Sequence, residues 1–283
     1  MKQRVVTGLL LAALLAVLLW LPGWCMAIAT LVCIGLAVWE EYHALGLAGH
    51  RVVTWPAWAA MALSVPLTNL LSQKVMIPLV VAALLAMTVQ VLFRREPELT
   101  DLAMSALPLL TVALPGLALV TLSMIDPYVW HVPTNPLPLH AVEVVILSVT
   151  FVVPLMGDVM ALYVGKAFGK HKFCPAVSPK KTVEGSIGGL AGSVLAAVVI
   201  YLLSRWLCNA QTLSYLPRWW MYPLLGLLGG FTGQMGDLFA SLVKRHCGLK
   251  DFSNLFPGHG GMLDRLDSVL FMAILMYCYL MFK

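Results

Sequence analysis

Aspartates and basic side chains gather in residues 234–267 of this sequence. Asp237, Asp264 and Asp267 offer hard oxygen ligands of the kind that Mg²⁺ prefers. Cations that hold phosphate oxygens well lie among them. These cations are Lys244, Arg245, Lys250 and Arg265. Carboxylates, cations and a glycine-rich backbone occur together in active sites for phosphoryl or nucleotidyl transfer. In these reactions the protein mainly positions groups and neutralises charge.

The spacing of these residues predicts two helix faces. Asp237, Ser241 and Lys244 share one face of an expected helix. An aspartate beside an apolar run is costly in lipid and usually faces a functional cavity; the alternative is an interfacial carboxylate paired with Lys244. Asp264 and Asp267 share a face in the first turn of the next helix. Because the helix dipole favours carboxylates there, simple dipole capping is the alternative for this pair.

A loop rich in glycine, residues 254–261, separates the two helices. Its proline and glycines forbid a continuous helix. Gly260 and Gly261 let backbone N–H groups approach an anion closely. We expect His259 to hydrogen-bond a phosphate rather than to act as a base. A plain surface turn would explain the loop equally well when it is considered alone.

A second polar segment, residues 165–189, repeats this chemistry. Its basic run 166–172 is suited either to a substrate phosphate or to anionic lipid headgroups. Residues 178–189 are more specific, because lysines and hydroxyls precede a helix start, which is a good phosphate receptor. The candidate binding residues here are Ser178, Lys180, Lys181, Thr182 and Glu184. Asp158, in the apolar run before this segment, is expected to face the same cavity.

The elements that position these residues are expected to be membrane helices. Of the 283 residues, 60% are hydrophobic and 11% are charged, whereas soluble domains have about 45–50% and about 25%. A spanning helix needs about 20 mostly apolar residues. Nine segments qualify: 5–21, 26–45, 53–71, 75–93, 102–125, 142–164, 187–207, 221–243 and 266–282. The expected fold is all-α, a polytopic membrane protein with about nine transmembrane helices, the fifth kinked or broken at Pro108 and Pro115.

The basic residues predict the orientation. If the N-terminus is cytoplasmic, fourteen of the 18 lysines and arginines lie on the cytoplasmic side, and the exceptions are Lys74, Arg205, Arg218 and Lys283. The net charge of +5 therefore indicates membrane orientation and not a nucleic-acid partner. The proline-rich segment 126–141, expected as an ordered coil on the outer side, separates five N-terminal spans in 1–125 from a catalytic region, 142–283, with four spans and both polar loops.

Three other features are expected to lack a chemical role. Glu40 and Glu41 end the second apolar segment and are most simply interfacial. The six cysteines contain no CxxC pair, so neither zinc nor a disulfide framework is expected. The first apolar segment has no small-residue cleavage site after it, so it is expected to be a retained helix rather than a signal peptide.

The stretch 241–267 resembles the signature of phosphatidate cytidylyltransferases, the CDP-diacylglycerol synthases. It runs Ser241-x2-Lys244-Arg245-x4-Lys250-Asp251-x5-Pro257-Gly258-His259-Gly260-Gly261-x2-Asp264-Arg265-x-Asp267. The segments 234–237 and 178–185 also resemble that family, whereas the first 125 residues match only as apolar helices. Around Asp158 the family's Asp-Thr-x-Ala-Tyr is replaced by Asp-Val-Met-Ala-Leu-Tyr, which weakens the correspondence there.

The resemblance implies an α-helical enzyme of the bacterial inner membrane, dimeric and dependent on Mg²⁺, with its active site on the cytoplasmic side. It implies transfer of the cytidylyl group of CTP to phosphatidic acid, which gives CDP-diacylglycerol and pyrophosphate in phospholipid biosynthesis. It also implies that Asp237 and Asp264 bind the metal, with room for a monovalent cation such as K⁺ nearby. Lys244, Arg245 and Asp267 complete the expected catalytic set.

Three other functions would also use charged side chains and a lipid substrate. A CDP-alcohol phosphotransferase would carry the cluster Asp-x2-Asp-Gly-x2-Ala-Arg, which this sequence lacks. A polyprenol-phosphate kinase would consume ATP without releasing pyrophosphate. A transporter or flippase for an anionic lipid should show repeats with matching broken helices in both halves, whereas the polar residues here crowd into the second half.

Overall fold

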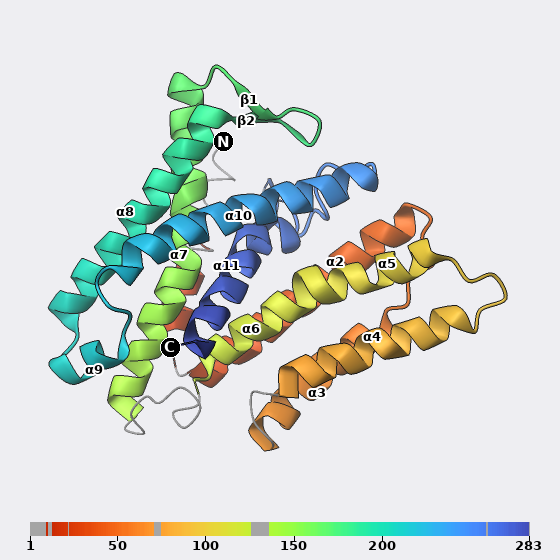
Figure 1. Cartoon of the computed structure of the whole chain (residues 1–283), viewed down its shortest axis with the longest axis horizontal. Coiled ribbons are helices and arrows are strands. Elements are labelled where there is room, and N and C mark those ends of the chain that lie inside the picture. The colour runs from red at the N-terminus through yellow and green to blue at the C-terminus, as the bar shows by residue number, and fades with distance from the viewer. Residues whose placement is uncertain are drawn as a thin grey trace.

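The computed structural model describes residues 10, 13–21, 23–70, 75–125, 136–258 and 260–282, and nearly all of them are helical. The helices are α2 (Gly23–Leu47), α3 (Trp55–Leu70), α4 (Met76–Leu92), α5 (Leu99–Pro108), the π-helical η2 (Leu109–Ala113), α6 (Leu114–Ser123), α7 (Pro136–Phe168), α8 (Val183–Leu207), α9 (Ala210–Tyr215), α10 (Met221–His246) and α11 (Leu263–Met281) (Figure 1). The all-α expectation is confirmed apart from a small antiparallel hairpin, β1 (Lys172–Cys174) and β2 (Ser178–Thr182).

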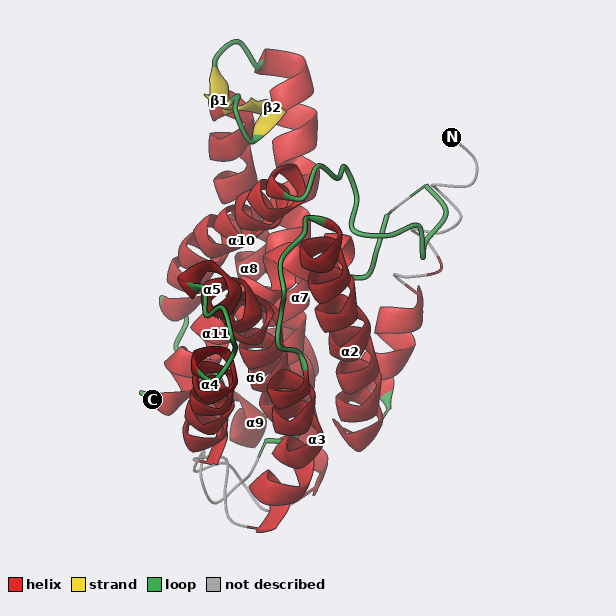
Figure 2. Ribbon diagram, turned by 90° about the vertical axis from the view of Figure 1, so that its right-hand side faces the viewer, coloured by secondary structure: helices red, strands yellow, loops and turns green. Residues whose placement is uncertain are grey.

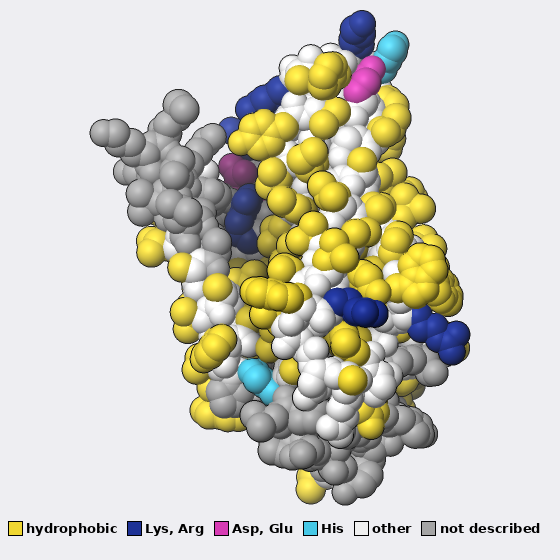
Figure 3. Space-filling view, turned by 90° about the vertical axis from the view of Figure 1, so that its left-hand side faces the viewer, with side chains coloured by type: hydrophobic (Ala, Val, Ile, Leu, Met, Phe, Trp, Pro, Cys, Tyr) yellow, Lys and Arg dark blue, Asp and Glu magenta, His cyan; other side chains and the backbone are white. Residues whose placement is uncertain are grey.

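Four stretches of the described chain are long and apolar enough to cross a membrane. They are Gly23–Leu47, Leu99–Ser123, His140–Phe168 and Val183–Leu207. Hydrophobic side chains also cover most of the outer face on the side of α7 and α8 (Figure 3), as expected for a surface in contact with lipid. The chain is therefore a multi-pass helical membrane protein. The count of nine spans stays a prediction. Of the first expected span, 5–21, the structure describes residues 10 and 13–21, and residues 13–20 are helical.

The fifth expected span is not broken at its prolines, but its helical register changes between them. α5, η2 and α6 form one continuous rod whose middle turn is π-helical. Pro108 and Pro115 flank this turn. A proline inside a helix removes one backbone hydrogen bond and crowds the preceding turn, and a local π register accommodates that loss.

α7 and α8 form a closely packed antiparallel pair that carries the hairpin at one end (Figures 1 and 2). Glycines permit this approach. A Cβ atom added at Gly188 would lie 2.6 Å from the side chain of Val164 on α7. α10 packs against α8, and α11 packs against α10, α7, α6 and α2. α11 therefore connects the N-terminal helices to the polar end of α10.

Two elements differ from expectation. α7 begins at Pro136, so the last six residues of the expected coil 126–141 are helical, while 126–135 lie outside the described residues. Proline is favourable at the first position of a helix because its fixed φ suits the helix and its missing N–H would be unpaired there. The short helix α9 was not predicted; the side chain of Asn209 caps it by accepting a hydrogen bond from the N–H of Thr212 at 2.8 Å.

Candidate active site

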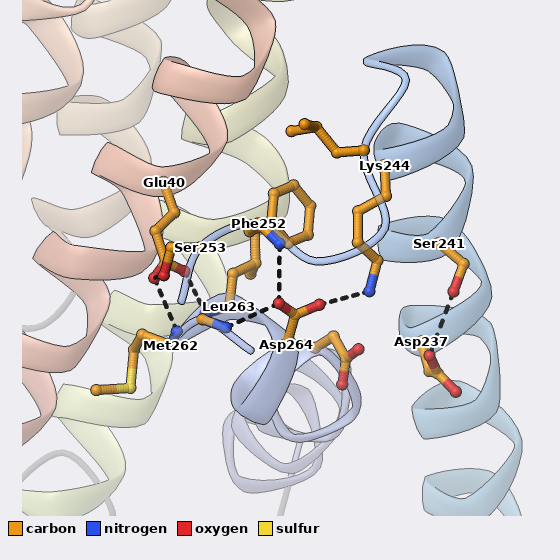
Figure 4. Close-up of polar contacts among 12 residues, drawn as sticks. Glu40, Asp237, Ser241, Lys244, Phe252, Ser253, Met262, Leu263 and Asp264 are labelled. Atoms are coloured by element: carbon orange, nitrogen blue, oxygen red, sulfur yellow. Dashed lines mark hydrogen bonds and ion pairs between the residues drawn. The ribbon is translucent and has the colours of Figure 1, made fainter. Parts of the chain in front are cut away.

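The end of α10 presents the expected polar face. Ser241 Oγ donates a long hydrogen bond of 3.5 Å to Asp237 Oδ1, one helical turn away. Lys244 follows on the same side, but its ammonium group reaches across to α11 and contacts Asp264 (Figure 4). The alternative pairing of Lys244 with Asp237 is therefore not the one that the structure shows.

Asp264 is bonded through both of its carboxylate oxygens. Its Oδ1 lies 2.5 Å from Lys244 Nζ, and its Oδ2 accepts hydrogen bonds of 2.9 Å from the N–H groups of Phe252 and Gly261 (Figure 4). The residue is buried at the first turn of α11. Dipole capping alone does not describe this arrangement, because Asp264 joins α10, the loop and α11 at one point.

The two polar segments of the sequence meet at a second ion pair. Lys181 Nζ, at the end of β2, lies 2.6 Å from Asp237 Oδ2 on α10. Both side chains are partly open to solvent. The hairpin thus brings its lysines to the face of α10 that the spacing of Asp237 and Ser241 predicted.

A cavity of about 450 Å³ lies between these elements. Its charged lining consists of Asp158, Asp237, Asp264, Asp267, Lys166, Lys180, Lys181 and Arg265. Ala161, Leu162, Leu238 and Phe173 give it an apolar wall. One space thus offers cations for phosphate oxygens, carboxylates for a metal ion and an apolar side for a lipid chain.

A sequence model of the Cytidylyltransferase family matches residues 2–283 of the chain. The chain belongs to this family. It is also similar to proteins named phosphatidate cytidylyltransferase, so the resemblance seen in the sequence is confirmed. The protein of Staphylococcus haemolyticus is 40% identical over 121 residues, 43% of either chain. That of Bacillus subtilis is 42% identical over 121 residues, 42% of this chain and 41% of the relative. That of Brucella abortus is 39% identical over 129 residues, 46% and 44% respectively. Each alignment thus spans less than half of the relative.

The cavity of this cytidylyltransferase-family protein gathers about half of the predicted site residues. Asp158, Asp237, Asp264, Asp267, Lys180, Lys181, Thr182 and Arg265 line it, whereas Ser178, Glu184, Ser241, Lys244, Arg245, Lys250, Gly260 and Gly261 do not. His259 lies outside the described residues. The binding roles proposed for these residues stay predictions.

Several of the predicted site residues also hold the segments around the cavity in place. Glu184 accepts hydrogen bonds from the N–H groups of Lys170 and His171 and pairs with the His171 ring. Thr182 caps α8 by accepting from the N–H of Gly185 at 3.1 Å. Arg245 donates to the carbonyl of Val177 in the hairpin turn at 3.4 Å. These contacts hold the hairpin segment against α8 and α10.

Two further contacts were missed from the sequence. Gln234 on α10 exchanges hydrogen bonds with Ser186 on α8, accepting from its hydroxyl at 2.5 Å and donating to its carbonyl at 2.9 Å. Glu40 was expected to be interfacial, but it is buried and accepts hydrogen bonds from the loop before α11. A carboxylate at the end of an apolar helix was the only available signal for Glu40, because its partners lie more than 210 residues away in sequence.

The carboxylates around the cavity suit a hard cation in their chemistry. One carboxylate oxygen of Asp237 forms an ion pair with Lys181, and the other accepts only a long hydrogen bond from Ser241. This second oxygen is therefore available to bind a metal ion. Asp264 has both oxygens engaged, so it can do so only if Lys244 withdraws. Among the described residues, no three His, Cys, Asp or Glu side chains are grouped to ligate one ion. Mg²⁺ commonly takes only one or two protein carboxylates and fills its remaining positions with water and substrate phosphates.

Proposed function

We propose that this protein transfers the cytidylyl group of CTP to phosphatidic acid, giving CDP-diacylglycerol and pyrophosphate. The observation that carries the proposal is the pair of lysine–aspartate contacts, Lys181 with Asp237 and Lys244 with Asp264. They assemble two polar segments around one cavity in a membrane protein of the cytidylyltransferase family. The names of the bacterial relatives support the choice of substrates.

The chemistry requires positioning and charge neutralisation more than proton transfer. An oxygen of the phosphatidic acid phosphate attacks the α-phosphorus of CTP, a new P–O bond forms, and the bond to the β-phosphate breaks to release pyrophosphate. The attacking phosphate is already an anion near neutral pH because its second pKa is about 6. No general base is therefore needed. Lys180, Lys181 and Arg265 in the cavity wall would neutralise the phosphate oxygens in the transition state.

The expected cofactor is Mg²⁺, with a monovalent cation such as K⁺ nearby. Asp237 and Asp264 are the residues proposed to hold the magnesium ion, which when bound would neutralise phosphate charge beyond what the side chains supply. Lys181 and Lys244 now occupy these two carboxylates. The proposal thus includes a competition between lysine and metal for the same oxygens.

The lipid substrate is proposed to enter sideways from the bilayer. Leu162 on α7 lines the cavity and is also exposed on the outer face. Val159 and Tyr163 beside it are exposed as well, so an apolar surface continues from the membrane to the cavity. The phosphate of phosphatidic acid would then meet the lysines while its acyl chains stay in lipid.

The wider proposal places the protein in the bacterial inner membrane as a homodimer with about nine spans. The charge bias of the sequence supports a cytoplasmic N-terminus and a cytoplasmic active site. Two of the expected spans, α3 and α4, have 16 and 17 residues, close to the lower limit for a spanning helix.

The test uses purified protein in detergent with phosphatidic acid and Mg²⁺, and supplies CTP or ATP in parallel. Pyrophosphate and CDP-lipid are measured, with the Asp264→Asn variant alongside. CTP-dependent release of pyrophosphate that disappears in the variant supports nucleotidyl transfer at this site. ATP consumption without pyrophosphate would indicate a lipid kinase instead. Absence of pyrophosphate with either nucleotide, while folded protein moves lipid between leaflets of a vesicle, would indicate a transporter.

A further inference from the structure

We infer that Glu40, on the N-terminal helix α2, is a positioning residue for the reaction: it holds the loop before α11 and thereby sets the place of Asp264. This inference rests on the proposed function and adds a role for the N-terminal half of the chain. The evidence lies in the hydrogen bonds, the burial and the space around one carboxylate.

The Glu40 carboxylate binds both ends of the loop. Its Oε1 accepts from the Ser253 hydroxyl at 2.6 Å and from the N–H of Met262 at 2.9 Å, and its Oε2 accepts from the N–H of Leu263 at 2.8 Å (Figure 4). Only 2% of the residue is exposed. No lysine, arginine or histidine of the described chain forms an ion pair with it, so the loop supplies its partners.

Asp264 binds the neighbouring groups of the same loop. The N–H of Phe252 donates a hydrogen bond to Asp264, and the hydroxyl of Ser253 donates one to Glu40. At the other end, the N–H of Gly261 donates a hydrogen bond to Asp264. The next two N–H groups, those of Met262 and Leu263, donate to Glu40. At both ends of the loop, Asp264 and Glu40 thus accept hydrogen bonds from neighbouring residues. A displacement of one carboxylate therefore displaces the donors of the other.

A carboxylate is suited to this place because a helix begins there. The first N–H groups of a helix have no partner within the helix, and the residue before α11, Met262, provides no side-chain cap. Glu40 supplies from α2 the acceptor that a capping serine or aspartate would supply locally. Its negative charge also lies at the positive end of the α11 dipole.

The glycines of the loop make room for the two carboxylates. A Cβ atom added at Gly261 would lie 2.5 Å from Glu40 Oε2, and one added at Gly260 would lie 2.7 Å from Asp264 Oδ2. The sequence predicted that these glycines let the backbone approach an anion. In the structure, the anions at these two positions are carboxylates of the protein itself.

Glu40→Gln tests the inference because it keeps the size of the side chain and removes one acceptor oxygen. We expect kcat for CDP-lipid formation to fall about 10- to 100-fold, since a small misplacement near the reacting groups has an effect of this size. The KM values for CTP and phosphatidic acid should stay within about threefold, because the groups that line the cavity are retained. Backbone amide exchange in residues 252–266 should become faster, and exchange in the middle of α11 should not change.

Glu143→Gln is the matched control. Glu143 is also a buried carboxylate that accepts one backbone hydrogen bond, from Ile125 at 3.2 Å, but it lies near the start of α7, away from the cavity. Its variant should keep the wild-type kcat and the wild-type exchange in residues 252–266. An equal fall of kcat in both variants would overturn the inference, because the effect would then reflect any loss of buried charge.

Gly261→Ala tests the same contact from the side of the loop, and serves if Glu40→Gln does not fold. The added methyl group collides with the Glu40 carboxylate, so kcat should fall about tenfold or more and loop exchange should rise. In the double variant Glu40→Ala/Gly261→Ala the methyl group has room. Its loss of kcat should therefore be smaller than the product of the two single losses. Independent, multiplicative losses would overturn the inference.

The outcomes separate this inference from the proposed function. A wild-type protein that makes no CDP-lipid contradicts the proposed function. An active wild type with unchanged kcat in Glu40→Gln contradicts the inference, whether or not exchange changes, because Glu40 would then be only structural. Slower catalysis with unchanged loop exchange contradicts it as well, since the effect would not pass through the loop.

Discussion

The ammonium nitrogen of Lys244 lies 2.5 Å from Oδ1 of Asp264, and both residues are buried. The contact joins the last turns of α10 to the first turn of α11. The other site aspartate, Asp237, is bound by Lys181 from the hairpin. Each of the two aspartates proposed as metal ligands thus has a lysine from another element, and the geometry of the site depends on how these elements pack.

Lys244→Met should destabilise the protein strongly. It leaves the buried Asp264 carboxylate with only two N–H donors, and removing one partner of a buried ion pair typically costs about 3–5 kcal/mol. Thermal unfolding in detergent should show a clearly lowered midpoint. The double variant Lys244→Met/Asp264→Asn removes both charges, so its midpoint should lie nearer the wild type. A double variant less stable than Lys244→Met would contradict this account.

Lys181→Ala should lower activity strongly and leave stability nearly unchanged. The pair with Asp237 is about a quarter exposed on each side, and such pairs contribute less than about 1 kcal/mol. Lys181 also lines the cavity, where losing one donor to a transition-state oxygen typically lowers the rate about 100-fold or more. We expect kcat/KM for CTP to fall by that factor while the unfolding midpoint barely moves.

Arg205→Ala is the control for a general loss of positive charge. Arg205 is exposed near the opposite end of α8 from the hairpin. Its removal should leave kcat/KM for CTP near the wild-type value. If both variants lost activity equally, the cavity would not be the place where Lys181 acts.

Local patterns predicted most helices and the polar face of α10, because apolar length and i, i+4 spacing are properties of neighbouring residues. The π turn between Pro108 and Pro115 was predicted only as a kink or break, since proline removes a hydrogen bond without fixing how the helix adjusts. The hairpin was missed because its two strands are short, with three and five residues, and neither has an alternating apolar pattern.

Tertiary partners could not be predicted in the same way. The sequence placed Lys244 near Asp237, because one helix carries both, whereas the structure places it on Asp264. Glu40 was expected to be interfacial because its own surroundings in the sequence are apolar, and its partners in residues 253–263 are distant along the chain. Which carboxylate meets which donor is decided by the packing of α2 and α10 around α11.

A comparison of two glycines should isolate the contact between the loop and Asp264. Gly248 and Gly260 both adopt positive φ, 68° and 82°, a conformation that costs an alanine about 1 kcal/mol. A Cβ atom at Gly248 would meet nothing within 4 Å, whereas one at Gly260 would lie 2.7 Å from Asp264 Oδ2. Gly248→Ala should therefore lower the free energy of unfolding by about 1 kcal/mol and leave kcat unchanged. Gly260→Ala should lower both, with kcat reduced about tenfold or more because the Asp264 carboxylate must move. Equal behaviour of the two variants in unfolding and in turnover would show that backbone strain alone accounts for the need for glycine at position 260.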